Sequence, residues 1–134
     1  MIEFAFVLPV LLLLLLGTFE FGHLFYVQLT LESAVREASR LALTGGSLPG
    51  YSRAESIVER IRQVAPGLEV QPGQVTIIGP GGAGDPGGPG DTVTIRVDYD
   101  VEMLTPIVGA LFHDGRQHFS VSFITRNEPF PDQG

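Results

Sequence analysis

The first residues of the chain form an apolar run that is hydrophobic on every side. No charged residue occurs from Phe4 to Phe19, and leucine fills every position from 11 to 16. A helix that is apolar all round belongs either inside a large protein or inside a membrane. The rest of the chain is too small to enclose such a helix. We therefore expect residues 1–29 to form a helical segment that lies among lipids or among other apolar helices.

The pattern of apolar residues changes at Thr30. From there apolar residues recur at helical spacing, and charged residues occupy the other positions. No helix breaker occurs between Gly22 and the Gly45-Gly46 pair, so the sequence predicts one continuous helix over residues 3–44. Its outer half should present one apolar face to a globular domain, and this stripe consists of Leu31, Ala34, Val35, Ala38, Leu41 and Ala42.

The following residues predict a second helix and several strands. Ser52 and Glu55 have the spacing of a capping box, and Pro66-Gly67 ends the helix that they begin. The Gly79–Gly90 segment is too rich in glycine and proline for regular structure, so we expect a surface loop that binds no ligand. A brief helical turn is expected within residues 104–112, and strands at residues 68–70, 74–78, 91–102 and 118–126.

Alternation of apolar and polar residues assigns faces to two of these strands. Apolar side chains occupy every second position in both, which is typical of strands with one buried face. The fold class expected is therefore α+β. Residues 30–134 form a head in which the outer half of the long helix packs on a small antiparallel sheet. The side chains expected to meet the helix are Val93, Ile95, Val97, Phe119, Val121 and Phe123.

A carboxylate stands immediately before the apolar run. Glu3 has two interpretations. In the first, its negative charge lies in the first turn of a helix and interacts favourably with the helix dipole. In the second, it pairs with the amine of a neighbouring copy inside an apolar assembly, because an unpaired charge in such surroundings is costly. The residues alone leave both interpretations open.

Four further residues interrupt the apolar helix. Pro9 lacks an amide hydrogen and Gly17 lowers helix propensity, so we expect a kink or a local break there in the assembled state. Glu20 and His23 lie three residues apart and therefore project from one helical face. We expect His23 to mask the charge of Glu20, or Glu20 to lie near a membrane interface.

Composition and spacing exclude several kinds of function. The net charge of −7 and the pI of about 4.7 argue against a nucleic-acid partner. The absence of cysteine excludes disulfides and thiolate metal sites. The three histidines are scattered and accompany no nucleophile, so we expect neither catalytic residues nor a cofactor or metal. Asp98, Asp100 and Glu102 prompt a calcium hypothesis, but their spacing matches no EF-hand loop, and an acidic solvated face is the simpler interpretation.

The first third of the chain resembles the TadE-like family of tight-adherence (Tad) pilus pilins and pseudopilins. The resemblance rests on the apolar run together with Glu3-Phe4, Leu8-Pro9, Glu20-Phe21-Gly22, Ala34 and Arg36-Glu37-Ala38. It implies a type IV pilin-like fold and a precursor whose basic leader is removed by a prepilin peptidase. It also implies extraction from the bacterial inner membrane by the pilus assembly machinery, and incorporation into an extracellular filament of identical subunits.

The resemblance implies a structural subunit that serves adhesion or surface attachment, with Glu3 as the family glutamate. Two alternatives stay open, namely a minor pseudopilin that primes assembly and a membrane-anchored binding domain. The residues expected to take part in assembly are Glu3, Phe4, Pro9, Gly17, Glu20 and His23.

Overall fold

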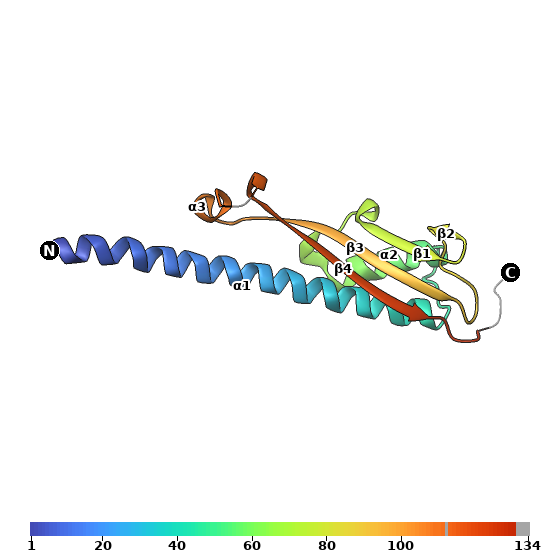
Figure 1. Ribbon diagram of the computed structural model, residues 1–134. Coiled ribbons are helices and arrows are strands. Elements are labelled where there is room, and N and C mark those ends of the chain that lie inside the picture. The colour runs from blue at the N-terminus through green and yellow to red at the C-terminus, as the bar shows by residue number, and fades with distance from the viewer. Residues whose placement is uncertain (112, 131–134) are drawn as a thin grey trace. The chain divides into compact units, whose positions relative to one another are not determined.

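The computed structural model of the chain describes residues 1–111 and 113–130. Helix α1 runs without interruption over Ile2–Leu43 (Figure 1), which confirms the expected single long helix. Its end is a Schellman motif, in which Gly45 N–H donates to Ala42 and Gly46 N–H donates to Leu41. Gly45 has φ +67°, and a Cβ there would lie 2.5 Å from the ring of Phe130. Only glycine fits this position without displacing the aromatic ring.

Helix α1 remains helical at both of its expected weak points. Pro9 lies inside the helix, and Gly17 has no neighbouring atom within 4 Å of a Cβ position. The isolated chain therefore shows no helix break at either residue. The expected kink concerns the assembled state, and for that state it stays a prediction.

The chain divides into two compact units. Unit 1 contains Met1–Gln28 and Asp100–His118, and unit 2 contains Leu29–Tyr99 and the chain from Phe119 onward. Each unit thus combines a part of α1 with parts of the chain that are distant in sequence. The functional division into residues 1–29 and 30–134 stays a prediction.

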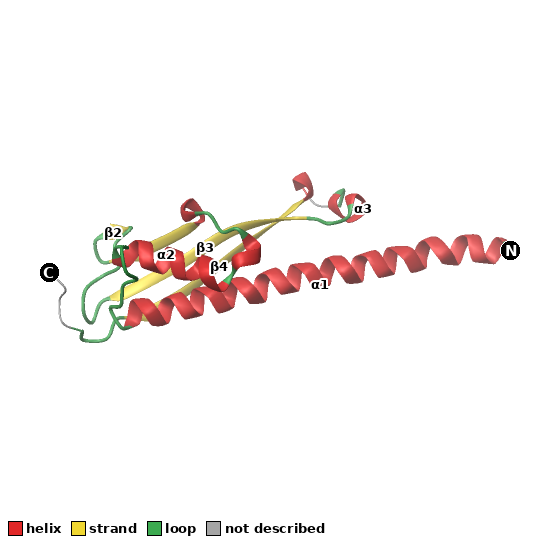
Figure 2. Cartoon of the chain, turned by 180° about the vertical axis from the view of Figure 1, so that it is seen from behind, coloured by secondary structure: helices red, strands yellow, loops and turns green. Residues whose placement is uncertain are grey.

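Unit 2 contains the second helix and most of a small sheet. Helix α2 spans Arg53–Val64, and its capping box of Ser52 and Glu55 is present as expected. Two short 3-10 turns follow it, at Pro66–Leu68 and Pro72–Gln74. The strands of the four-stranded antiparallel sheet lie in the order β2-β1-β3-β4, with β1 at Val75–Gly79, β2 at Gly82–Ala83, β3 at Thr92–Glu102 and β4 at Arg116–Arg126. In Figure 2, α2 lies across one face of this sheet.

The core of unit 2 joins the helical stripe to the sheet. Val93, Ile95 and Val97 of β3 are fully buried, so the face assigned to this strand is confirmed. On α1 the buried residues of the stripe are Leu31, Ala34, Val35, Ala38 and Ala42. The α+β fold with an apolar stripe packed on a small antiparallel sheet is therefore present.

The edge strand β4 is less buried than its sequence pattern predicts. Phe119 and Val121 are half-buried, and Phe123 is 40% exposed. Leu41, at the side of the helical stripe, is also only half-buried. The expectation that Phe123 lies in the core is wrong, because β4 is the last strand of the sheet and lacks a neighbour on one side.

The predicted strand at residues 68–70 is also wrong. Leu68 ends a 3-10 turn that begins at Pro66, and Glu69 adopts the left-handed conformation with φ 48°. Neither conformation is compatible with an extended strand. The carbonyl of Leu68 instead accepts a hydrogen bond from the hydroxyl of Tyr99, and burial raises the pKa of this hydroxyl.

The glycine-rich loop contains more structure than its composition predicts. Gly82–Ala83 forms β2, which pairs with the end of β1. The carboxylate of Asp85 accepts hydrogen bonds from the amides of Gly81 at 2.7 Å and Gly87 at 2.9 Å. The amide of Asn127 donates to the carbonyls of Pro86 and Gly88. Side chains of the same chain therefore bind this loop along much of its length.

Candidate functional site

Most of the exposed large apolar side chains of the described chain lie on the first half of α1 and form an apolar surface there. Leu12, Leu13 and Leu14 are each about half exposed or more, at 49%, 50% and 65%, and Phe19 is 73% exposed. By length and composition α1 is the one described helix that could cross a membrane. This surface can be covered by lipid or by other copies of the helix.

Glu3 lies at the exposed end of this surface. Its carboxylate accepts a hydrogen bond from the Met1 amine, with 3.2 Å between Oε2 and N, and both groups are solvent-exposed. Phe4 beside it is 69% exposed. Glu3 therefore has an amine partner within its own chain, whereas pairing with a neighbouring copy stays a prediction.

Glu20 is the buried carboxylate of unit 1. Its side chain is 2% exposed, although it lies between Phe19 and Phe21, which are exposed. Oε1 accepts a hydrogen bond from the amide of Leu104 at 2.8 Å. Oε2 accepts one from the amide and one from the hydroxyl of Thr105, both at 3.0 Å. Three donors therefore bind this carboxylate. Hydrogen bonds to a charged acceptor are stronger than hydrogen bonds between neutral groups.

This arrangement differs from one of the two expectations for Glu20, masking by His23, whereas the other, a position near a membrane interface, stays a prediction. The groups that bind the Glu20 carboxylate come from the segment that follows β3, rather than from the next turn of α1. His23 itself is half-buried. The sequence contains no local signal for this contact, because Leu104 and Thr105 are 84 and 85 residues away from Glu20.

Local sequence explains why backbone amides are available near Glu20. Thr105 has extended backbone dihedrals and precedes Pro106, and a residue before proline is biased away from helical conformation. Pro106 begins the one-turn helix α3, Pro106–Gly109, which confirms the brief helical turn expected there. The amides of Leu104 and Thr105 therefore lie before the helix and are free to donate to Glu20.

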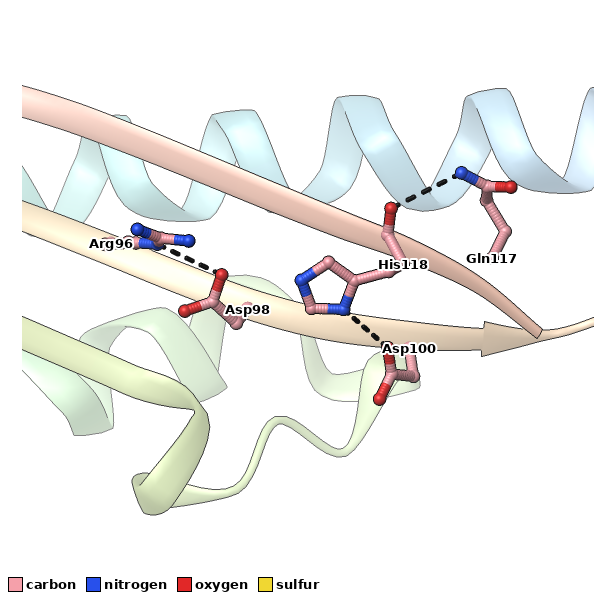
Figure 3. Close-up of polar contacts among 5 residues, drawn as sticks. All are labelled: Arg96, Asp98, Asp100, Gln117 and His118. Atoms are coloured by element: carbon pink, nitrogen blue, oxygen red, sulfur yellow. Dashed lines mark hydrogen bonds and ion pairs between the residues drawn. The ribbon is translucent and has the colours of Figure 1, made fainter. Parts of the chain in front are cut away.

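Cross-strand pairs stabilise the strand ends that carry this segment. The amide of Met103 donates to the carbonyl of Gly115 at 3.1 Å. Arg116 of β4 lies 2.9 Å from Glu102 of β3. Nδ1 of His118 lies 2.6 Å from the carboxylate of Asp100, as Figure 3 shows. We call residues 103–111, which these contacts and Glu20 hold, the tip.

The three carboxylates of the calcium hypothesis each have a protein partner. Asp98 lies 3.1 Å from Arg96, and Asp100 contacts His118 (Figure 3). Glu102 contacts Arg116. Within residues 1–111 and 113–130, no three His, Asp or Glu side chains are grouped closely enough to hold a metal ion. The calcium hypothesis therefore finds no ligand cluster in the described chain.

Arg53 connects separate segments of unit 2 through polar contacts. Its guanidinium donates to the carbonyls of Gly87 and Ala42, and it lies 4.6 Å from the ring centroid of Phe130. Burial lowers the pKa of Arg53, and the nearby Asp85 acts in the opposite direction. An arginine remains charged despite such a shift, so we assign Arg53 a structural role in joining the glycine-rich loop to α1.

Comparison with known proteins finds a similarity that is confined to the long N-terminal helix. The model of the family described as TadE-like protein matches residues 1–40. No curated protein and no solved structure matches the chain. The matched residues include Glu3, the leucine run, Glu20 and most of the buried stripe of α1. The first 40 residues of this chain are therefore TadE-like, which confirms the resemblance inferred from the same residues.

Proposed function

We propose that the chain is a pilin, the structural subunit of an extracellular filament of the type IV or Tad kind. It assembles through the apolar half of α1 and serves adhesion or surface attachment. The observation that carries this proposal is the exposure of the uncharged run from Phe4 to Phe19. The TadE-like match over residues 1–40 supports it, because the match covers this run.

Under this proposal the exposed apolar half of α1 is covered first by lipid and later by other helices. Before assembly the bilayer surrounds the helix, since α1 is long and apolar enough to span it. After extraction only other apolar helices can replace the lipid. Each leucine that becomes buried contributes roughly 1.5–3 kcal/mol, so helices of neighbouring copies stabilise one another. Repeated heterologous contacts that do not close a ring produce an open filament.

The remaining partners follow from the same proposal. The inner membrane holds the subunit first, a prepilin peptidase processes it, and the pilus assembly machinery extracts it. In the filament Glu3 pairs with the amine of a neighbouring copy. In a single copy the Glu3 carboxylate lies 3.2 Å from the Met1 amine of its own chain, and in the proposed filament an amine of a neighbouring copy takes this place.

Electron microscopy of surface material tests the proposal. Cells that express the full chain with its assembly machinery are sheared, and the released material is imaged beside that from cells lacking the chain. The proposal predicts fibres in which this chain is the principal protein. Fibres that contain only traces of the chain would favour a minor pseudopilin. Fibres that are unchanged by its loss, with all of the chain extracted as detergent monomers, would contradict the proposal and favour a membrane-anchored binding domain.

A further inference from the structure

The tip presents apolar side chains that unit 1 does not bury. Leu104, Ile107 and Leu111 are 61%, 56% and 82% exposed. Outside α1, these are the strongly exposed large apolar residues in the described part of unit 1. These three residues lie within eight positions of the chain, and we call their side chains the patch. Exposed apolar side chains that lie together commonly mark a surface for a protein or a membrane.

Glu20 determines where this patch lies along α1. Its carboxylate binds the amides of Leu104 and Thr105 at 2.8 and 3.0 Å. Glu20 is also the first charged residue after the uncharged run. Within unit 1 the tip is therefore held beside α1 at the position where the membrane-compatible run ends.

The length of the run determines how deeply the tip lies. Phe4 to Phe19 comprises 16 residues, or about 24 Å of helix at 1.5 Å per residue. The hydrocarbon core of a bilayer is about 30 Å thick. A short span is accommodated by local thinning of the bilayer or by entry of the flanking residues. Both adjustments bring Glu20, together with the tip that it binds, to the lipid interface.

Side chains of α1 beyond Glu20 agree with this depth. Phe21, Phe25 and Tyr26 are 69%, 55% and 60% exposed. Aromatic side chains are enriched at the boundary between hydrocarbon and water. The charged residues flanking the tip include Glu102, which pairs with Arg116, and the exposed acidic Asp114. The patch is therefore suited to a neutral lipid surface that it contacts through apolar side chains.

We propose that the tip is a membrane-docking element, which inserts Leu104, Ile107 and Leu111 into the interface of the bilayer that α1 spans. Glu20 positions the tip by binding its backbone. The element fixes the depth of the unassembled subunit and adds to its retention in the membrane. This inference rests on the membrane-spanning stage of the proposed function and does not depend on filament formation.

Fluorescent labelling of the full chain tests the proposal. The chain has no cysteine, so a single Ala110→Cys substitution attaches an environment-sensitive dye to an exposed position of the tip. Ser120→Cys, exposed on β4 in unit 2, provides the control position. Each labelled chain is reconstituted in phosphatidylcholine vesicles that contain lipids with a quencher at a shallow acyl position. We expect several-fold stronger quenching at position 110 than at 120, whereas equal quenching would overturn the proposal.

A matched pair of double variants tests the patch itself. In the Ala110→Cys chain, Ile107→Ser with Leu111→Ser removes two exposed patch residues without opening a core. Ile78→Ser with Ile124→Ser removes two exposed isoleucines of unit 2, which are 43% and 69% exposed. The first pair should reduce quenching at position 110 several-fold, and the second should leave it unchanged. Equal effects of the two pairs would overturn the assignment of the patch.

Dilution and a deeper label distinguish contact with lipid from contact between copies of the chain. Quenching at position 110 should persist when the ratio of protein to lipid is lowered tenfold. Loss of quenching on dilution would overturn the proposal in favour of contact between copies. A Leu13→Cys label should be quenched by deeply placed quenchers, and its failure would refute the membrane-spanning stage and this inference together. Filament failure with normal quenching at both positions would leave the docking element supported and refute only the pilin assignment.

Discussion

At the scale of single residues, Glu20 is the group that joins distant parts of unit 1. It is one of the few side chains in the described part of this unit that are almost fully buried, together with Val27 and Val101. A buried carboxylate without partners would strongly destabilise the fold. Here three donors from Leu104 and Thr105 form hydrogen bonds with the carboxylate and offset the cost of burying it. Removal of the carboxylate would leave these donors without their acceptor.

The first prediction concerns this contact. Glu20→Ala should increase amide exchange at Leu104 and Thr105, because hydrogen bonds to charged groups contribute about 1.5–3 kcal/mol each. We expect a local loss of at least about 1.5–3 kcal/mol, the contribution of one such hydrogen bond, measured by hydrogen exchange of the full chain in detergent micelles. Glu3→Ala removes an exposed carboxylate from the same helix and should leave both amides unchanged. Undiminished protection in Glu20→Ala would show that the contact contributes nothing.

The second prediction concerns Glu3. Glu3→Ala should reduce filament yield and leave membrane insertion intact, because the role proposed for this carboxylate begins when lipid is replaced by neighbouring helices. Glu3→Asp retains the charge and should preserve part of the yield. The measurements are fibre yield after shearing and the amount of chain in the membrane fraction. Normal fibre yield from Glu3→Ala would contradict the paired role.

Residues differ in how far their roles could be read from the sequence. Glu3 is a charged residue immediately before an apolar run, and Pro9 is a proline within it, so both can be recognised from their neighbours in the sequence. The partners of Glu20 are not visible, because they are backbone amides of a segment 84 residues away. The sequence does carry an indirect signal, since Thr105-Pro106 predicts a segment with unpaired amides. It contains nothing that would connect that segment to Glu20.

At the scale of elements, the apolar pattern predicts what is long and regular. The continuous α1, the capped α2 and the alternating β3 follow directly from periodicity and capping residues. The failed strand at residues 68–70 depended on three residues, and the left-handed Glu69 was not predictable from its side chain. Burial of Phe123 was overestimated because alternation shows which face a side chain occupies and not how completely that face is covered.

The third prediction tests the packing between α1 and the sheet. Val97 is fully buried on β3, so Val97→Asp should destabilise unit 2 by on the order of 3–5 kcal/mol through an unpaired buried charge. Ile124→Asp on β4 introduces the same charge at a position that is 69% exposed, and it should change stability by less than about 1 kcal/mol. Chemical unfolding of the full chain in micelles measures both. Equal stability of the two variants would refute the assigned face of β3.

The fourth prediction concerns the pH dependence of the glycine-rich loop. The amide of Gly87, and then that of Gly81, hold the pKa of Asp85 below its ordinary value by donating hydrogen bonds to the carboxylate. A lowered folded-state pKa stabilises the loop above the unfolded pKa of about 3.9, and this contribution is lost as the pH falls through the folded pKa. The amide resonances of both glycines should therefore shift with a midpoint below about pH 3.9. Asp85→Asn should remove the shift, and a midpoint above that value in the unmodified chain would contradict the account.

At the scale of the whole molecule, the chain combines a TadE-like segment at residues 1–40 with a longer part that the family model does not cover. The apolar half of α1 is exposed in a single copy, whereas the stripe of α1 in unit 2 is already buried within its own chain. One helix thus contains a part that requires other molecules and a part that does not. The sequence shows this difference through the change of pattern near Thr30, but it does not show which molecules cover the exposed part.

The central claim is that copies of the apolar half of α1 cover one another in a filament. Electron cryomicroscopy with helical reconstruction of the sheared fibres tests this most directly. The account predicts density for α1 in which residues 4–19 of neighbouring copies pack side by side, with Glu3 beside an amine of another copy. Fibres in which residues 4–19 contact no other copy would contradict it.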